Sequence, residues 1–520
     1  EALEDAAPAP MAIRAGASRS MAYAPPPAPA MAPMPDIRMP SGEFNTEEYA
    51  HIDEAPFKST MQDPLSTFSI DVDTASYANA RRFIEREGRL PPPDAVRLEE
   101  FINYFDYDYP NPTGEHPFSV TTEVSSAPWA PAHRLVHIGL QGRKIDTAAL
   151  PASNLVFLLD VSGSMNSPDK LPLLKQAFKM LVRNLRPHDK VAIVVYAGAA
   201  GLVLPSTNGK DQQAILDAID RLSAGGSTAG GAGIKLAYQI ARDNFIKGGN
   251  NRIILATDGD FNVGVSSQGD LVRMIEEERK SGVFLTILGF GGGNYKDSKM
   301  EELSNKGNGN AAYIDNVLEA KKVLVTEMGG TLLTIAKDVK IQVEFNPAKV
   351  KGYRLLGYEN RALANRDFND DTKDAGELGA GHTVTVLYEI IPTDSKEPLP
   401  GVDALKYQTR EVSDAAKASP EMLTVKLRYK QPDGDKSTLL EQPLVDQGVT
   451  LSKTSADFRF SAAVAEMAMV LRGSKFSGDA SYAHVIERAS GALGKDTEGY
   501  RAGFVQLARR AQAIAEAQGK

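Results

Sequence analysis

Between residue 154 and about residue 336, short apolar runs alternate with amphipathic segments, and this alternation constrains the fold more than any other feature of the chain. A short unbroken apolar run is typical of a strand buried on both faces. Strands that alternate with helices predict a mostly parallel sheet with helices on both sides. We expect strands at residues 155–159, 191–196, 202–204, 253–256, 283–288 and 312–314. We expect helices at residues 170–185, 211–222, 233–245, 268–280, 296–306 and 317–335.

The period changes to two after residue 336, where apolar and polar residues alternate at 339–345, 384–390 and 423–429. Such alternation predicts the strands of an antiparallel β-sandwich. The third segment ends near Asp433-Gly434, a pair typical of a hairpin turn. Residues 118–124 and 135–140 have the same pattern. We therefore expect these earlier strands to complete the sandwich, and the doubly wound α/β domain to be inserted within it.

A tether and two helical regions complete the predicted organisation. Residues 1–61 are rich in Ala, Pro and Met and bury too little apolar surface to offset the entropy of ordering, so we expect a disordered tether. Helices are expected at 75–87, at 93–105 and in a C-terminal segment. The last helix carries an apolar stripe that we expect to pack against the protein: Tyr500, Phe504, Leu507, Ala511 and Ile514. The predicted parts are residues 1–61, 62–150, 151–336, 337–450 and 451–520.

Composition narrows the classes of function. The 520 residues include 58 Lys and Arg against 67 Asp and Glu, and the formal net charge is -9. Because binding to phosphate backbones needs a basic face, this balance argues against a nucleic acid partner. The chain contains no cysteine, which excludes disulfides, thiolate metal sites and cysteine catalysis. No apolar run reaches about 18 residues, so we expect no membrane-spanning segment.

Oxygen-bearing side chains follow two of the expected strands. Asp160, Ser162 and Ser164 come directly after the first strand, and Asp258 ends the fourth. Thr228 lies in a glycine-rich loop before a helix. If the sheet is doubly wound with strand order 3-2-1-4-5-6, strands one and four are neighbours, and these segments meet at one edge. Carboxylate and hydroxyl oxygens suit a hard divalent cation.

This set of residues resembles the metal-ion-dependent adhesion site of von Willebrand factor A domains, which has the pattern D-x-S-x-S with a distant Thr and Asp. The resemblance implies a site for Mg²⁺, with Ca²⁺ or Mn²⁺ as substitutes, formed by Asp160, Ser162, Ser164, Thr228 and Asp258. Because only two of these ligands are carboxylates, we expect the ion to keep an open position. Its expected complement is an acidic side chain of a partner protein.

Segments outside the α/β domain are similar to the bacterial YfbK-like family of A-domain proteins. They are residues 68–77 (FSIDVDTASY), 99–105 (EEFINYF), 367–377 (DFNDDTKDAGE) and 458–467 (FRFSAAVAEM). The resemblance implies a cell-envelope protein, periplasmic or surface-associated, that is exported and often lipid-anchored. The chain begins at Glu1 and not at Met. We expect either that a signal peptide or lipid-modified cysteine was removed, or that the chain is a trimmed cloning product.

Three classes of function are compatible with these features. The first is a binding module, not an enzyme, that captures a protein partner through the cation. The second is a scaffold or chaperone-like assembly factor of the envelope, with the metal as an auxiliary. The third is a metal-assisted hydrolase with Asp260 as its base.

Asp71 and Asp73 resemble the start of aspartate-based phosphatases, but Ala75 departs from that pattern. We expect Asp73 or Thr74 to cap the following helix instead. No phosphatase activity is therefore predicted.

Asp367, Asn369 and Asp371 resemble part of a calcium-binding loop. Thr372 and Leu378, however, stand where such a loop has Gly and Glu. The alternative that we favour is an acidic turn between strands of the sandwich.

Overall fold

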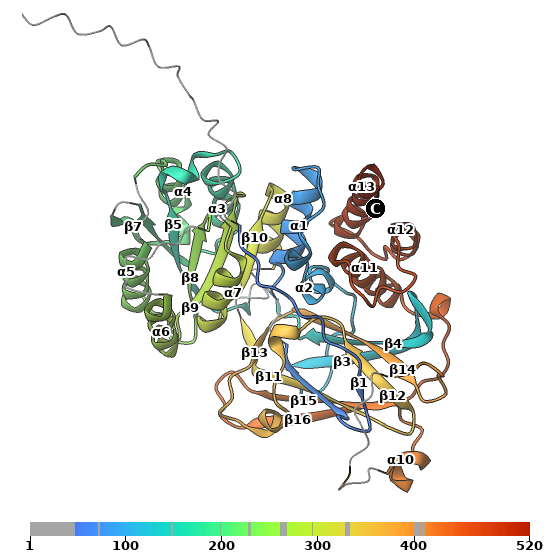
Figure 1. Cartoon of the computed structure of the whole chain (residues 1–520). Coiled ribbons are helices and arrows are strands. Elements are labelled where there is room, and N and C mark those ends of the chain that lie inside the picture. Colours follow the sequence, from blue (N-terminus) through green and yellow to red (C-terminus); the bar gives the residue numbers. More distant parts are fainter. Residues whose placement is uncertain are drawn as a thin grey trace, which may run out of the picture. The chain divides into compact units, whose positions relative to one another are not determined.

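The computed structural model describes residues 47–70, 73–146, 149–197, 199–226, 230–259, 268–293, 295–327, 333–399, 406 and 411–519. These residues form three β-sheets and the helices that pack on them (Figure 1). Among them, no helix combines the length and the apolar character needed to cross a membrane.

The α/β domain contains a sheet with the strand order β10-β9-β8-β5-β6-β7. Its strands are β5 (Ser153–Asp160), β6 (Lys190–Tyr196), β7 (Ala200–Asn208), β8 (Asn250–Thr257), β9 (Phe284–Phe290) and β10 (Ala311–Ile314). Neighbouring strands are parallel except β6 and β7. Numbered within the domain, this is the order 3-2-1-4-5-6, which confirms the predicted doubly wound sheet.

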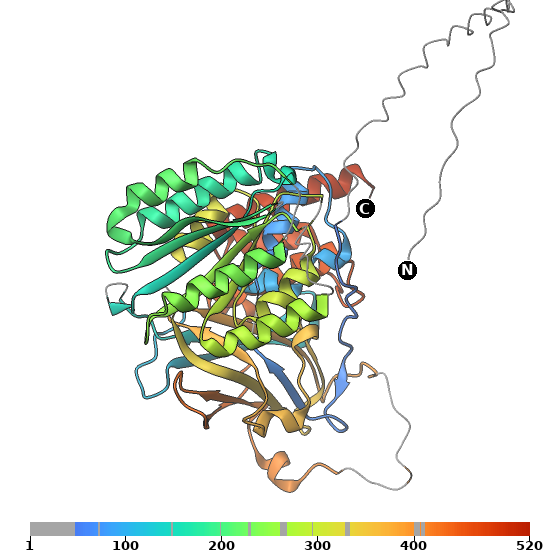
Figure 2. The same cartoon turned by 90° about the vertical axis from the view of Figure 1, so that its left-hand side faces the viewer.

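Helices cover both faces of this sheet (Figure 2). They are α3 (Leu171–Arg183), α4 (Gln212–Asp220), α5 (Gly230–Asp243), α6 (Gln268–Glu278), α7 (Asp297–Lys306) and α8 (Val317–Lys321). Side chains of α3, α4 and α8 share a core with Leu155 and Phe157, whereas α5, α6 and α7 share the opposite core with Val156 and Leu158. Successive side chains of one strand point to opposite faces, so β5 contributes to both cores.

Two antiparallel sheets form the sandwich around a shared core. One sheet has the order β1-β12-β14-β4-β3, and the other has the order β13-β11-β15-β16 with β2 beside β11. The strands are β1 (Lys58–Ser59), β2 (Leu65–Ser69), β3 (Phe118–Ala127), β4 (Ala130–Gly142), β11 (Thr334–Phe345), β12 (Val350–Leu355), β13 (Gly376–Gly379), β14 (Thr383–Pro392), β15 (Leu423–Lys430) and β16 (Ser437–Leu444). Because β4 pairs with β14, strands from before and after the α/β domain share one sheet. The predicted insertion is confirmed.

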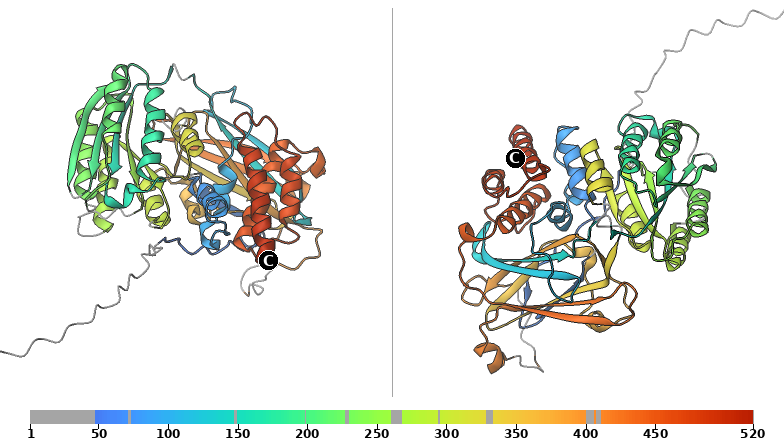
Figure 3. Two further views of the ribbon diagram at one scale, coloured as in Figure 1. Left: turned by 90° about the horizontal axis from the view of Figure 1, so that it is seen from above. Right: turned by 180° about the vertical axis from the view of Figure 1, so that it is seen from behind.

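Helices from both ends of the described chain pack together beside the sandwich (Figure 3). They are α1 (Ala75–Glu85), α2 (Leu98–Asn103), α11 (Ala456–Arg472), α12 (Tyr482–Ser490) and α13 (Tyr500–Ala517). On α13, Phe504, Leu507 and Ala511 are buried in this helical cluster, and Tyr500 and Ile514 pack at its margin. The predicted apolar stripe is therefore part of the core.

The expected tether extends too far. Residues 47–61 contact the folded body, since β1 pairs with β12 and the Glu47 carboxylate forms an ion pair with Arg82 at 2.9 Å. A strand of two residues and an ion pair across 35 positions leave no periodic pattern in the sequence. These contacts are therefore invisible to an argument from composition.

Two expected helices are wrong in part. The helix expected at 317–335 consists of α8 and a π-helical turn (Lys322–Thr326), and β11 already begins at Thr334. The helix expected at 93–105 is interrupted, because Val96 is extended between a 3₁₀ turn (Pro93–Ala95) and α2. The Val96 carbonyl accepts hydrogen bonds from the Arg472 side chain, a partner that no local pattern indicates.

Candidate metal centre

Asp160 and Asp258 lie at the carboxyl ends of two neighbouring parallel strands, β5 and β8. Leu159 pairs with Ala256, so Asp160 lies beside Thr257, and the Thr257 hydroxyl donates to Asp160 Oδ2 at 3.3 Å. Both carboxylates are buried, with 0% relative exposure. The structure thus brings two predicted site residues to one edge of the sheet.

The loop after β5 presents two hydroxyls next to Asp160. The backbone N–H of Ser162 donates to Asp160 Oδ1 at 2.8 Å, which holds the loop against the carboxylate. The hydroxyl oxygens of Ser162 and Ser164 are 3.0 Å apart. Ser162 is buried whereas Ser164 is exposed, so the cluster is closed on the Asp160 side and open to solvent on the Ser164 side.

The glycine-rich loop that precedes α5 contacts the same place. The N–H of Gly225 donates to the Val161 carbonyl at 2.8 Å, and the N–H of Gly163 donates to the Gly226 carbonyl at 3.1 Å. This loop leads directly to Thr228, which itself lies outside the described residues, as does Asp260.

The Asp160 carboxylate is in an unfavourable environment for a negative charge. Burial raises the pKa of Asp160 to about 6, hydrogen bonds from Ser162 oppose this shift, and the nearby Asp258 charge adds to it. A buried carboxylate that is ionised costs free energy unless a cation compensates it. A bound divalent ion would supply such compensation.

The arrangement of donors fits a small divalent ion. In an octahedral shell with metal–oxygen distances of about 2.1 Å, adjacent ligand oxygens are about 3.0 Å apart. The distance of 3.0 Å between the Ser162 and Ser164 oxygens matches such an edge. Asp160 and Asp258 would supply the negative charge, directly or through water, and the exposed side near Ser164 would leave room for a further ligand.

Lys170 is a member of this cluster that the sequence analysis did not identify. Its Nζ donates to Asp258 Oδ2 at 2.9 Å, and the two side chains are 10% and 0% exposed. Lys170 precedes α3, six positions after Ser164, and a lysine at a helix start is usually exposed to solvent. The one indication in the sequence was a lysine placed shortly after a loop rich in oxygen-bearing side chains.

The other acidic patterns have protein partners in the structure. Asp73 accepts from the N–H of Ala311 at 2.8 Å and pairs with Arg361, and the α1 N-cap has no side-chain hydrogen bond, so the expected helix capping is wrong. Asp71 lies outside the described residues.

In the turn that resembles a calcium loop, Asn369 accepts from Arg428 and Asp371 accepts from Ser437. Across the part of the chain that the structure describes, no three His, Cys, Asp or Glu side chains gather as a metal site. The candidate metal centre in the α/β domain is not such a group of three, because two of its described oxygen donors, Ser162 and Ser164, are serines.

Three family models match the chain. One described as "von Willebrand factor type A domain" matches residues 154–325, and one described as "von Willebrand factor" matches residues 43–137. A third, described as "Uncharacterized protein YfbK, C-terminal", matches residues 330–514. Together they cover the α/β domain and most of the sequence on either side of it.

Among similar proteins, the uncharacterized protein YfbK of Escherichia coli K12 is 45% identical over 478 residues, which are 91% of this chain and 82% of that protein. The uncharacterized protein sll0103 of Synechocystis is 31% identical over 172 residues, 32% of this chain and 39% of that protein.

Two solved structures resemble parts of the chain. A von Willebrand factor type A protein from Catenulispora acidiphila aligns over 87% of this chain and 91% of its own, with 14% identity and a TM-score of 0.39. The conserved hypothetical protein BatB from Bacteroides thetaiotaomicron aligns over 34% and 97%, with 23% identity and a TM-score of 0.30.

Proposed function

Because this chain belongs to the family of the uncharacterized protein YfbK and contains a von Willebrand factor type A domain, we propose that it binds a protein partner through a divalent cation. The proposed ligands of the cation are Asp160, Ser162, Ser164, Thr228 and Asp258. The ion is Mg²⁺, with Mn²⁺ or Ca²⁺ as substitutes, and an acidic side chain of the partner completes its shell. In this proposal the site binds and does not catalyse.

The geometry of the loop after β5 is the observation that carries the proposal. Two serine oxygens 3.0 Å apart lie beside a buried aspartate whose ionisation calls for a cation. Ser164 is exposed, so another protein can reach an ion at this place. The exposed hydroxyl of Ser164 next to the buried Asp160 carboxylate therefore favours a site that binds a ligand over a cluster that only stabilises the fold.

Calorimetry tests the metal. Titration with Mg²⁺ and with Mn²⁺ should give a 1:1 binding isotherm for the native protein and none for Asp160→Ala. Asp217→Ala is the matched control, since this carboxylate lies exposed on α4 of the same domain. If the native protein and Asp160→Ala give the same absence of heat, the proposal fails.

Affinity capture tests the partner. Native protein and Asp160→Ala are incubated with envelope extract, with and without a chelator. We expect a partner that is retained by native protein with Mg²⁺ and lost after chelation or in Asp160→Ala. A partner retained under all four conditions would instead favour a scaffold for which the metal is auxiliary.

We also propose a cell-envelope location. The proposal follows from the resemblance of residues 68–77 and 458–467 to the envelope family. Fractionation of cells that express the natural gene with a C-terminal tag should recover the protein with envelope fractions. Recovery with cytosolic marker enzymes would contradict this location without affecting the metal site.

A further inference from the structure

The ammonium group of Lys170 lies beside the candidate metal ligands and is held there by protein contacts. Its Nζ donates to Asp258 Oδ2 at 2.9 Å, and the aspartate is fully buried. An ion pair with one partner fully buried is screened by solvent much less than a surface pair. The positive charge is therefore a fixed part of the site.

Gly291 and the loop before α3 hold the lysine in place. A Cβ added to Gly291 would lie 2.5 Å from Cγ and Cε of Lys170, so the lysine stem passes directly over this backbone after β9. Gly291 has φ +70, a conformation that side chains rarely adopt. The N–H of Lys170 donates to the Ser167 carbonyl at 3.1 Å, and Asp169 accepts from Ser167 and from Arg86. Several elements thus fix the direction of the lysine.

The charge count of the site changes when Lys170 is included. Asp160 and Asp258 supply two negative charges and the serine hydroxyls supply none. The positive charge of Lys170 offsets one of the two negative charges. A divalent ion at this place would then leave a net charge of about +1. Without the lysine, the two carboxylates would neutralise the ion and the site would have less attraction for an anion.

We propose that Lys170 is a positioning residue that keeps the loaded site positive, so that the cation binds weakly alone and tightly together with a carboxylate from outside. This inference rests on the proposed function and deepens it. The lysine lowers the affinity for the free cation and raises the dependence of that affinity on an anionic ligand. Coupling of this kind is reciprocal, because the anion and the cation strengthen each other's binding by the same factor.

The test measures Mn²⁺ affinity by calorimetry, with and without acetate as the anionic probe. Lys170→Met keeps most of the length of the side chain and removes its charge. We expect Lys170→Met to bind Mn²⁺ about tenfold more tightly than the native protein and to lose the enhancement by acetate. Lys170→Gln, which retains a hydrogen-bond donor for Asp258, should give the same result if Lys170→Met does not fold. Lys175→Met is the control, since Lys175 lies on α3, five positions after Lys170, and donates to the Asp220 carbonyl.

The outcomes separate this inference from the proposed function. Native protein that binds Mn²⁺, together with Lys170 variants whose affinity is unchanged or lower, would overturn the role of Lys170 and leave the metal site standing. Absence of binding by native protein both with and without acetate, combined with binding by the Lys170 variants, would refute the proposed function and the coupling of the cation to an anion. Absence of binding in all variants would refute both.

Discussion

Asp160 illustrates at the scale of a single residue how a proposed metal ligand can lower the stability of the metal-free protein. Burial raises the pKa of its carboxyl from 3.8 to about 6, so the folded state binds a proton more tightly than the unfolded chain. Above the folded pKa the ionised group destabilises the metal-free protein, and the cost disappears as the pH falls from about 6 towards 4. This cost is in line with the proposed role of Asp160 as a ligand of a cation.

Asp160→Asn should raise the stability of the metal-free protein at pH 7. The amide can accept the Ser162 N–H but carries no charge, so the gain is at most about 3 kcal/mol by the pKa difference. Thermal melts in chelator should show a higher Tm for the variant, whereas added Mg²⁺ should stabilise only the native protein. A lower Tm for the variant in chelator would contradict this account of the carboxylate.

Asp169, nine positions after Asp160, provides a matched control because its pKa is shifted in the opposite direction. Burial opposes ionisation of Asp169, but hydrogen bonds from Ser167 and the charges of Arg86 and Lys170 outweigh it, and the net pKa is lowered. Asp169→Asn should therefore lower the Tm at pH 7, where native Asp169 is ionised and stabilising.

The residues of the site differ in how visible they are in a sequence. Asp160, Ser162 and Ser164 form a local pattern after an apolar strand, and Asp258 follows from the strand order. Lys170 is much harder to identify, because its contact with Asp258 spans 88 positions and depends on the path of the lysine over Gly291. Local spacing predicts ligands that share a turn but not a charge that arrives from another element.

At the scale of elements, the junction between β4 and α11 contains a buried series of hydrogen-bonded side chains. His137 Nε2 lies 2.6 Å from the Tyr109 hydroxyl, and Nδ1 lies 3.0 Å from the Ser461 hydroxyl. Burial lowers the pKa of His137 to about 4. The histidine is therefore neutral in the folded protein at pH values where it is charged in the unfolded chain.

This histidine predicts acid sensitivity. Between pH 6.5 and 4 the unfolded chain binds a proton that folded His137 does not, so stability falls as the pH falls. At pH 5 the loss from this residue is about 2 kcal/mol relative to pH 8. Denaturant unfolding of native protein and His137→Gln at both pH values should show a smaller pH effect in the variant. Equal pH effects would refute the assignment, and His484→Gln, at an exposed site, serves as the control.

Gly139 in β4 leaves space for the ring of Tyr109, the residue whose hydroxyl contacts His137. A Cβ at Gly139 would lie 2.4 Å from the ring, a distance that the closely packed neighbours cannot accommodate without moving. Gly139→Ala should destabilise the protein by about 1–3 kcal/mol, the usual cost of overpacking. Gly201→Ala is the matched control, because this strand glycine in β7 has open space around its Cβ position. Chemical denaturation of the two variants gives the comparison.

Elements with a strong period were predicted well, and those that depend on distant partners were not. The β5 and β8 strands and the sandwich strands β14 and β15 follow directly from their apolar patterns. The helix prediction for residues 317–335 was wrong at its end because the apolar residues suit a helix. In the structure Thr334 pairs with Gly379 of β13, and Ile335 belongs to the core of the sandwich. Pairing energy from a strand more than 40 positions away exceeds the local preference.

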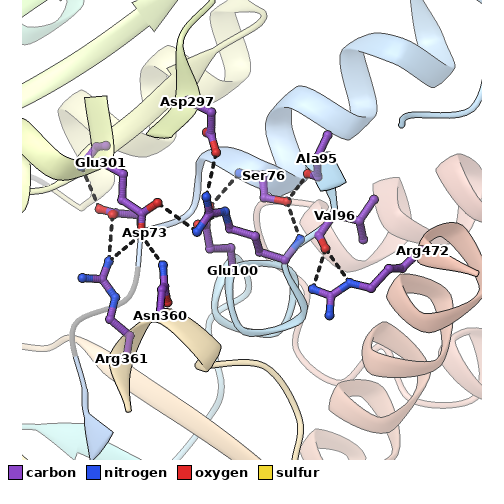
Figure 4. A network of polar contacts seen from close by, with 12 residues as sticks. Asp73, Ser76, Ala95, Val96, Glu100, Asp297, Glu301, Asn360, Arg361 and Arg472 are labelled. Carbon is purple, nitrogen blue, oxygen red and sulfur yellow. Dashed lines mark hydrogen bonds and ion pairs between the residues drawn. The ribbon is translucent and has the colours of Figure 1, made fainter. Parts of the chain in front are cut away.

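At the scale of the whole molecule, buried charges join the A domain, the sandwich and the helices (Figure 4). Arg361, next to the sandwich, pairs with Asp73 at 3.3 Å and with Glu301 of α7 at 3.1 Å. Arg472 of α11 donates to the Val96 carbonyl at 2.9 and 2.6 Å. Because the arginines and carboxylates are charged and at most 13% exposed, separation of the parts would leave several of them without partners. The described body should therefore unfold as one unit.

Arg97 is the residue whose removal tests this coupling most directly. It lies before α2 and pairs with Glu100 at 3.5 Å and with Asp297 and Glu301 of α7 at 3.1 and 2.8 Å, with all four side chains at most 13% exposed. Arg97→Ala leaves these carboxylates without their shared cation, which should cost about 3–5 kcal/mol. Because the lost contacts join two parts, calorimetry should show one transition for native protein and two for the variant.

The exposed pair of Lys280 and Glu277 provides the comparison, since both side chains lie within α6 and the 3₁₀ turn after it and are at least 66% exposed. Lys280→Ala should leave the transition single and its midpoint nearly unchanged, because an exposed ion pair contributes little. If Arg97→Ala also unfolds in one transition at the native midpoint, the buried charges do not couple the A domain to the helices.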